Sequence, residues 1–202
     1  MRGFDAAAMD AYLYDIPTSP RGSAGWEAEL TEKNTAFAEA CDANSDGILP
    51  DSTTINSARD MDLIRAVLGD SQLNYLGYSY GTFLGATYAN LYPEKAGRLV
   101  LDGAIDPSVP GLEVGATQAL GFESALRAYM QDCLDSGSCP FNGSVDDAMA
   151  DLGALLASVD RTPLENGDGR MLGADSLMTG IIAALYSQDS WTFLTQALDE
   201  AL

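Results

Sequence analysis

One five-residue pattern constrains this chain more than any other feature. Residues 77–81 read Gly-Tyr-Ser-Tyr-Gly, which has the form G-x-S-x-G. The apolar run Leu-Asn-Tyr-Leu at 73–76 precedes the pattern, and a helical stretch of small residues at 82–91 follows it. In that context the pattern is typical of a sharp strand–turn–helix element that exposes its serine, Ser79. A second apolar run at 98–102 completes a predicted βαβ unit.

Two interpretations of Ser79 follow from this turn. Its hydroxyl can serve as a nucleophile once a base removes the proton. It can also cap the helix that begins near Tyr80, by accepting a hydrogen bond from a backbone N–H. Capping explains the serine but leaves both flanking glycines without a reason, whereas a tight, strained turn requires small residues there. We therefore predict that Ser79 is a nucleophile.

The usual base for such a serine is histidine, and this chain has no histidine. Lys95 lies beyond the helix that follows Ser79, roughly 20 Å away at the wrong edge of the sheet. Asp102 ends the second predicted strand at the same edge as Ser79, but a carboxylate is too weak a base for an alcohol. We expect Asp102 to hydrogen-bond the loop at 103–106 instead. The sequence thus predicts a nucleophile without its base and acid.

Composition excludes several classes of partner. The 202 residues carry 30 acidic and 10 basic side chains, a net charge of −20, which disfavours nucleic acid and anionic membranes. The apolar stretches are shorter than a membrane span. The first five residues show no apolar core of a signal peptide. No cofactor is expected, and the length permits one domain or one domain and part of another.

One segment matches half of a calcium-binding loop. Residues 42–47 read Asp-Ala-Asn-Ser-Asp-Gly, but Thr53 stands at the twelfth position, where such a loop needs a bidentate glutamate. A turn rich in Asp and Asn explains the same residues. Calcium binding at 42–53 stays open, and no metal ligand is assigned.

Three cysteines are present, at positions 41, 133 and 139. Cys133 and Cys139 flank a segment with Gly and Ser, which lets the chain close a disulfide, and a disulfide implies an oxidising compartment. Two free thiols are the alternative. We predict a Cys133–Cys139 disulfide with Cys41 left over, and an odd cysteine suggests a missing partner.

The order of the elements indicates an α/β fold with a helical addition. Residues 1–26 are expected to be irregular apart from one helical turn, and residues 161–173 to form a loop with a short extended stretch at 171–172. Helices are expected at 27–41, 54–68, 115–134, 144–158, 175–186 and 191–202. For the second of these, Thr53 or Thr54 is the expected cap and Gly69 the end, and its apolar stripe is Ile55, Ala58, Met61, Ile64, Val67 and Leu68. A capping box at 144–147 is expected to open the fourth. Two parallel strands are too few to cover both of their faces. We therefore predict a partial α/β core at 1–107 and a partial helical cap, or lid, at 108–202.

Several segments together resemble the actinobacterial tripeptidyl aminopeptidases, secreted α/β-hydrolases related to prolyl aminopeptidases. The resemblance covers nearly the whole chain. Its motifs are Thr53-Thr54, Ala58-Arg59-Asp60-Met61-Asp62, Arg65, Leu68-Gly69, the segments 73–82, 84–89 and 98–103, and in the cap Cys133, Cys139-Pro140-Phe141, Ala184-Leu185-Tyr186, Trp191, Leu194 and Ala197-Leu198.

The resemblance implies a serine peptidase that acts on peptide N-termini and is secreted or held in the cell envelope. Ser79 matches the family nucleophile, and Tyr80 matches the position whose backbone N–H helps to bind the oxyanion. The family places a Gly-rich oxyanion loop upstream of this region, and its acid and base after the lid. The resemblance therefore implies an internal fragment that is inactive alone. A non-catalytic remnant of a hydrolase and an esterase or acyltransferase remain as alternatives.

Overall fold

The computed structural model describes residues 3–202 and groups them into two compact units. Residues 41–117 form the first unit. The second unit combines the N-terminal stretch up to Ala40 with residues 118–202. Within the described residues, no helix is long and apolar enough to cross a membrane.

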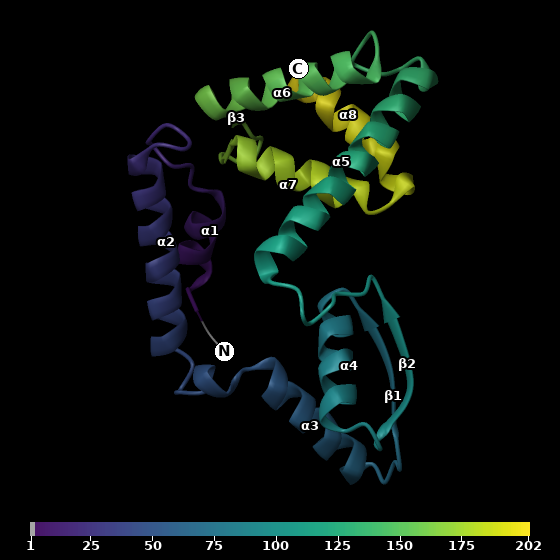
Figure 1. Cartoon of the computed structure of the whole chain (residues 1–202). Helices are drawn as coiled ribbons and strands as arrows, with labels where there is room; N and C mark the ends of the chain where they lie inside the picture. The colour runs from purple at the N-terminus through teal and green to yellow at the C-terminus, as the bar shows by residue number, and fades with distance from the viewer. Residues whose placement is uncertain (1–2) are drawn as a thin grey trace. The chain divides into compact units, whose positions relative to one another are not determined.

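The first unit is built on two parallel strands joined through a helix (Figure 1). Strand β1, Leu73–Tyr78, pairs with β2, Ala96–Asp102, from Leu73 opposite Ala96 to Tyr78 opposite Asp102. Helix α4, Tyr80–Leu91, connects them. Helix α3, Thr54–Val67, packs against α4, and a short 3-10 turn, η1, spans Leu49–Asp51. The strand, turn, helix and strand predicted from the sequence are confirmed.

Local sequence explains where α3 begins and ends. The Thr53 hydroxyl accepts a hydrogen bond from the Asn56 amide at 3.2 Å, which caps the helix as the sequence predicted. Gly69 follows with φ +78°, a left-handed conformation that glycine adopts readily at helix ends. Leu68 is the last residue before that turn.

Helix α4 covers only one face of the two-stranded sheet. Tyr75 and Leu101 lie on that face, where both contact the position of Gly85 in α4. Side chains alternate between the faces of a strand, so the neighbouring residues Leu76, Tyr78 and Val100 lie on the other face. These three side chains are 55%, 63% and 59% exposed. We call this apolar surface the open sheet face.

Helix α3 leaves most of its predicted apolar stripe exposed as well. Ala58 and Arg65 are buried, whereas the larger apolar side chains remain open to solvent. The exposed set comprises Ile55, Leu63, Ile64, Val67 and Leu68.

The second unit is mainly helical. Its helices are α1 (Ala6–Tyr14), α2 (Ala24–Ala43), α5 (Gly111–Ser136), α6 (Val145–Arg161), α7 (Ala174–Leu185) and α8 (Trp191–Ala201), with a 3-10 turn, η2, at Gln188–Ser190. Helix α2 runs past the boundary at Ala40, and α5 begins before the one at Gln118. The core between α5, α6, α7 and α8 includes Tyr129, Met130, Leu152, Ile181 and Leu198. Cys133 and Cys139 form a disulfide beside it, and Cys41 is free.

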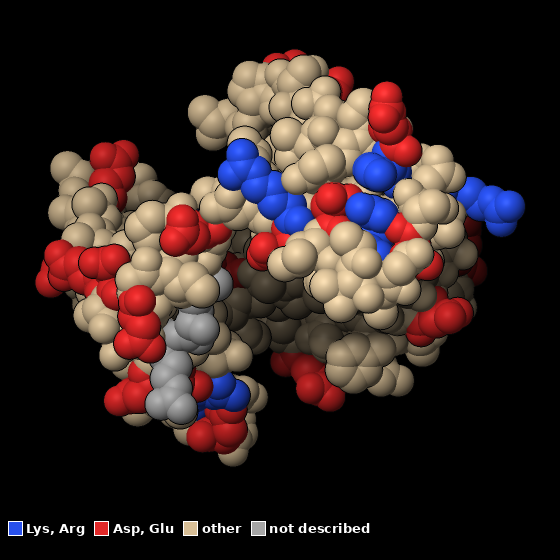
Figure 2. Space-filling view, turned by 90° about the horizontal axis from the view of Figure 1, so that it is seen from below, with Lys and Arg blue, Asp and Glu red and all other residues tan. Residues whose placement is uncertain are grey.

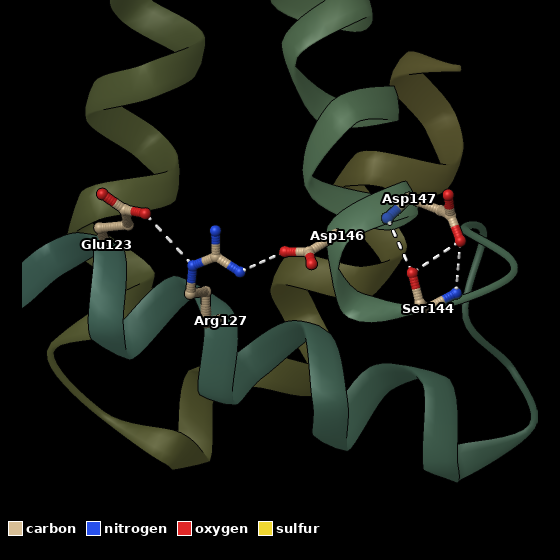
Figure 3. Close-up of polar contacts among 5 residues, drawn as sticks. All are labelled: Glu123, Arg127, Ser144, Asp146 and Asp147. Atoms are coloured by element: carbon tan, nitrogen blue, oxygen red, sulfur yellow. Dashed lines mark hydrogen bonds and ion pairs between the residues drawn. The ribbon is translucent and has the colours of Figure 1, made fainter.

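The start of α6 shows the capping box that the sequence predicted (Figure 3). The Ser144 hydroxyl accepts from the Asp147 amide, and the Asp147 carboxylate accepts from the Ser144 amide at 2.8 Å. The Ser144 hydroxyl also donates to the Asp147 carboxylate at 2.7 Å, and this bond, followed by that from the Ser144 amide, lowers the pKa of Asp147. Nearby, Arg127 of α5 bridges Glu123 and Asp146, which links α5 to α6.

Two segments differ from the sequence prediction. Residues 6–14 form a full helix rather than one turn, because Asp5 caps it by accepting from the Ala8 amide and the alanines favour helix. In the predicted loop at 161–173, the expected extended stretch at 171–172 is confirmed as β4 (Met171–Leu172), but the strand with which it pairs antiparallel, β3 (Leu164–Glu165), was not predicted. The division into a hydrolase core at 1–107 and a cap at 108–202 stays a prediction.

Arginines fasten the N-terminal helices to the rest of the second unit. Arg21 contacts Asp160 of α6 and Asp175 of α7, both at 2.9 Å. Arg170 contacts Asp10 of α1 at 3.1 Å and lies over the Tyr14 ring. These contacts explain why the N-terminal stretch groups with the helical unit.

Candidate active site at the nucleophile turn

Ser79 occupies the one-residue turn between β1 and α4, in a strained backbone conformation. Its φ is +51° and its ψ is −118°, although a residue other than glycine rarely adopts positive φ. Ser79 is exposed, and its hydroxyl makes no capping hydrogen bond to α4. The structure therefore does not support the capping interpretation. Strain of this kind at an exposed nucleophilic side chain points to a functional role.

The glycines of the motif are required by close approach. A Cβ on Gly77 would lie 2.5 Å from the Gly81 carbonyl oxygen and 2.6 Å from the Tyr75 ring. A Cβ on Gly81 would lie 3.1 Å from the Tyr75 hydroxyl, which itself donates to the Gly81 carbonyl at 2.8 Å. The Tyr75 ring thus lies across the start of α4, and only glycine at position 77 lets the helix pack so close to the strand.

Hydrogen bonds to the end of β2 hold the backbone of Ser79. Its amide donates to the Asp102 carbonyl at 3.0 Å. Gly103, the residue after Asp102, turns the chain with φ +69°. The Ser79 carbonyl accepts from the Thr82 amide at 2.9 Å and from the Thr82 hydroxyl at 2.6 Å. That hydroxyl in turn accepts from the Ile105 amide at 2.9 Å, and Thr82 is 1% exposed.

Tyr80 is the first residue of α4. The first amides of a helix have no acceptor within the helix, so the Tyr80 N–H is suited to bind an anion at the turn. Its side chain is directed elsewhere: the Tyr80 hydroxyl shares a 2.8 Å hydrogen bond with Thr54 of α3, and its ring stacks on Phe83. The backbone of Tyr80, rather than its phenol, is therefore the group available to an oxyanion.

A polar network joins α3 to α4 behind the turn. The Asp62 carboxylate accepts from Arg65 at 2.7 Å and from the buried Tyr88 hydroxyl at 3.0 Å. Arg65 also donates to the Asp70 carbonyl in the loop before β1. The hydrogen bond from Arg65, assisted by that from Tyr88, lowers the pKa of Asp62. Burial is the main reason why the pKa of Tyr88 is raised.

Other titratable groups do not complete the site. The Lys95 carbonyl accepts from the Leu73 amide, so Lys95 lies where the parallel strands begin, opposite the edge that carries Ser79 and Asp102. This geometry excludes Lys95 as the base. In the loop after β2, the carboxylate of Asp106 accepts hydrogen bonds from the Ser108 amide and hydroxyl. Among the described residues, the Asp102 carboxylate accepts no hydrogen bond from residues 103–106, so the expectation that it would bind this loop is not met; the Asp102 backbone carbonyl accepts from the Ser79 amide.

Within the described part of the chain, neither a metal-ligand cluster nor a cavity of the second unit supplies a base for Ser79. Among residues 3–202, no three His, Cys, Asp or Glu side chains are placed to hold a metal ion. A cavity of about 420 Å³ lies between α1 and α2, and its mainly apolar lining also includes Asp15, Glu29, Glu32 and Lys33. One of them, Glu29, is occupied by hydrogen bonds from Thr18 and Ser19. Lys33 donates to the Asp15 carbonyl. This cavity therefore lacks an activated nucleophile.

The sequence predicted the turn at Ser79 but not the side chains that hold the turn and the neighbouring helices in place. Thr82, Tyr75 and the Asp62–Arg65–Tyr88 network lie in the segments that carry the family resemblance, but no role was predicted for them. The spacing of Asp62 and Arg65 on one helix face is the only local signal that pointed to the network.

Comparison with known proteins decides the family. A model of the α/β-hydrolase fold matches residues 4–175. The chain belongs to the α/β-hydrolase fold family. This agrees with the partial parallel sheet, the exposed serine turn and the helical unit, and it confirms the fold class predicted from the sequence.

Among its relatives in this α/β-hydrolase family, the chain is 36% identical to the serine protease Hip1 of Mycobacterium tuberculosis over 181 residues, 86% of this chain and 35% of that protein. It is 34% identical to the tripeptidyl aminopeptidase of Streptomyces lividans over 161 residues, 77% of this chain and 29% of that protein. It is 37% identical to carboxylesterase B of Mycobacterium tuberculosis over 193 residues, 95% of this chain and 37% of that protein. The chain thus spans about a third of the length of the curated relatives it matches.

Proposed function

We propose that this chain carries the nucleophile of a serine hydrolase that cleaves peptides from their N-termini. Ser79 is the proposed nucleophile, and the Tyr80 backbone N–H is the proposed oxyanion donor. The observation that carries the proposal is the exposed Ser79 hydroxyl on a strained turn at the head of α4. Relatives named as a serine protease and a tripeptidyl aminopeptidase support the peptide substrate.

The proposed reaction is an acyl transfer. The Ser79 oxygen bonds to the substrate carbonyl carbon while a base takes its proton, and the oxyanion accepts from the Tyr80 N–H. The peptide C–N bond then breaks as the base returns the proton to the leaving amine. Because the 202 residues include no histidine, we place the base and its acid partner outside them and expect the chain to be nearly inactive alone.

Two further parts of the proposal concern location and partners. The Cys133–Cys139 disulfide supports an oxidising compartment, in agreement with secretion or residence in the cell envelope. The net charge of −20 supports a peptide rather than nucleic acid or an anionic membrane as the partner. We further propose that residues 1–107 belong to the catalytic core and residues 108–202 to the cap.

Labelling by a fluorophosphonate probe tests the proposed nucleophile. The wild-type chain should label slowly at pH 7 and faster as free imidazole is added as an external base, and Ser79→Ala should abolish this labelling. Ser108→Ala, which changes another exposed serine of the same unit, is the matched control and should label like wild type. Imidazole-dependent labelling that survives Ser79→Ala would refute the nucleophile. Fast labelling without imidazole would refute the placement of the base.

Similarity to carboxylesterase B favours an esterase as the second candidate. With imidazole present, the peptidase proposal predicts Ser79-dependent release from a peptide with a free N-terminus, in preference to its N-acetylated form. Ser79-dependent cleavage of a p-nitrophenyl ester without any peptide cleavage would favour the esterase. A chain that binds peptides but never acylates at Ser79 would favour a non-catalytic remnant.

A further inference from the structure

We propose that Thr82 is a positioning residue for the nucleophile: its hydroxyl ties the Ser79 turn to the loop after β2. This inference rests on the proposed role of Ser79. The Thr82 hydroxyl donates to the Ser79 carbonyl at 2.6 Å and accepts from the Ile105 amide at 2.9 Å. One side chain therefore joins the Ser79 turn to the loop at Ile105, which lies 23 positions after Thr82 in the sequence.

A threonine hydroxyl that bonds to its own helix is common, so the bond to Ser79 alone would carry little weight. Exposed threonines elsewhere in the chain bond in this way to the carbonyl four residues earlier, namely Thr31, Thr35, Thr117 and Thr179. Thr82 differs from them in three respects. It is 1% exposed, its acceptor is the strained turn residue three positions earlier, and it also receives an amide from another segment.

The geometry gives this bridge a specific task. Ser79 holds positive φ, a conformation that persists only when its surroundings enforce it. The Ser79 amide is held by the Asp102 carbonyl, at the end of β2. The Ser79 carbonyl is held by Thr82, which is itself held by Ile105 in the loop that follows β2. The amide and the carbonyl of Ser79 are thus both held, directly or through Thr82, by the end of β2 and the loop after it. This fixes the backbone of Ser79 and with it the direction of the hydroxyl.

Without the hydroxyl, the helix can still form and the Ser79 carbonyl keeps its hydrogen bond from the Thr82 amide, but the link from that carbonyl to the Ile105 amide is lost. Val has nearly the shape of Thr and keeps the packing of the buried side chain, while Ser keeps the hydroxyl and loses one methyl group. A small displacement of a nucleophile costs between about tenfold and hundredfold in rate. We therefore expect Thr82→Val to slow acylation at Ser79 by about tenfold or more, and Thr82→Ser to restore most of the rate.

The test measures fluorophosphonate labelling of Ser79 with imidazole present, at several probe concentrations, in the full 202-residue chain. These measurements separate probe affinity from the maximal labelling rate. Thr82→Val should lower the maximal rate and leave the affinity unchanged. Thr87→Val is the matched control, because Thr87 lies in the same helix and bonds to the Phe83 carbonyl. It should label like wild type.

If Thr82→Val fails to fold, Ile105→Pro removes the amide from the other end of the bridge and should lower the maximal rate in the same way.

The outcomes separate this inference from the proposed function. If Ser79 of the wild type does not label, the proposed nucleophile is wrong and the role of Thr82 in positioning it is wrong as well. If the wild type labels and Thr82→Val labels at the same maximal rate, the nucleophile stands and the positioning role is overturned. A slow Thr82→Val that Thr82→Ser does not restore also overturns it, since the loss would then come from packing and not from the hydroxyl.

Discussion

The backbone conformation of Ser79 is held by hydrogen bonds to neighbours on both sides of the residue. Its positive φ needs support from both sides, and the structure supplies that support through the Asp102 carbonyl and the Thr82 hydroxyl. The flanking Gly77 serves a different purpose, because it lets the Gly81 carbonyl and the Tyr75 ring approach the strand. The G-x-S-x-G motif therefore combines a conformational demand at its serine with a steric demand at its first glycine.

The steric demand at Gly77 can be measured. We expect Gly77→Ala to destabilise the first unit by about 1–3 kcal/mol, because the added methyl group would overlap the Gly81 carbonyl oxygen. Gly115→Ala is the matched control in α5, where a Cβ meets nothing within 4 Å. It should stabilise by about 0.4–1 kcal/mol. Both tryptophans, Trp26 and Trp191, lie in the second unit, so unfolding should be followed by hydrogen exchange of the β1 amides. Equal stabilities for the two variants would contradict the steric argument.

Asp62 gives a pH-dependent prediction. Its pKa is lowered in the folded chain, chiefly by Arg65. The ionised Asp62 carboxylate therefore stabilises the fold fully above a pH of about 3.9, the pKa of an Asp in an unfolded chain. This stabilisation is lost as the pH falls through the lower pKa that Asp62 has in the folded chain. Asp62→Asn should destabilise the first unit at pH 6, and its difference from wild type should shrink towards pH 3. Asp60→Asn, at an exposed position of the same helix, should have little effect at either pH. A difference for Asp62→Asn that is constant with pH would refute the charge-based explanation.

At the level of elements, the predictions that succeeded rest on local signals. Thr53 caps α3, Gly69 ends it, and Ser144 with Asp147 opens α6, and each of these signals lies within a few residues of the boundary that it sets. The strand–turn–helix context of Ser79 is local in the same sense. The sequence alone therefore predicted both the βαβ unit and the predominantly helical character of residues 108–202.

What the sequence did not predict depends on contacts between distant residues. The bridge from Thr82 to Ile105 joins a helix to a loop beyond the next strand. The Tyr88–Asp62 hydrogen bond joins α4 to α3. Neither has a periodicity or spacing that marks it in the sequence. Helix α1 was underestimated for a different reason: Pro17, Pro20, Gly22 and Gly25 follow soon after its end and indicated an irregular segment.

The capping box of α6 tests the local signals directly. We expect Ser144→Ala to destabilise the second unit by about 0.5–2 kcal/mol, because the Asp147 amide loses its acceptor. Ser158→Ala, at an exposed position inside the same helix, is the control and should stay within about 0.5 kcal/mol of wild type. Trp191 fluorescence in a urea titration reports on this unit. If the two variants were equally stable, the capping box would make no net contribution.

At the scale of the whole chain, charge and apolar surface act against each other. Acidic side chains are scattered over the face shown in Figure 2, in keeping with 30 acidic and 10 basic residues overall. This charge keeps copies of the chain apart through a repulsion that salt screens. The open sheet face, formed by Leu76, Tyr78 and Val100, favours contact instead. In the first unit, the sheet therefore exposes an apolar surface that only net charge protects from association.

Association should consequently increase with salt and depend on the open sheet face. We expect the chain to be mainly monomeric at low ionic strength and to associate in 1 M NaCl, where the screening length is about 3 Å. Val100→Glu should reduce this association, because it places a charge in the middle of the open sheet face. Leu112→Glu adds the same charge at a 92% exposed site in α5, outside that face, and should associate like wild type. Sedimentation velocity across a salt series distinguishes the two variants. If both reduce association equally, net charge alone controls it; if wild type stays monomeric in 1 M NaCl, the open sheet face does not drive association.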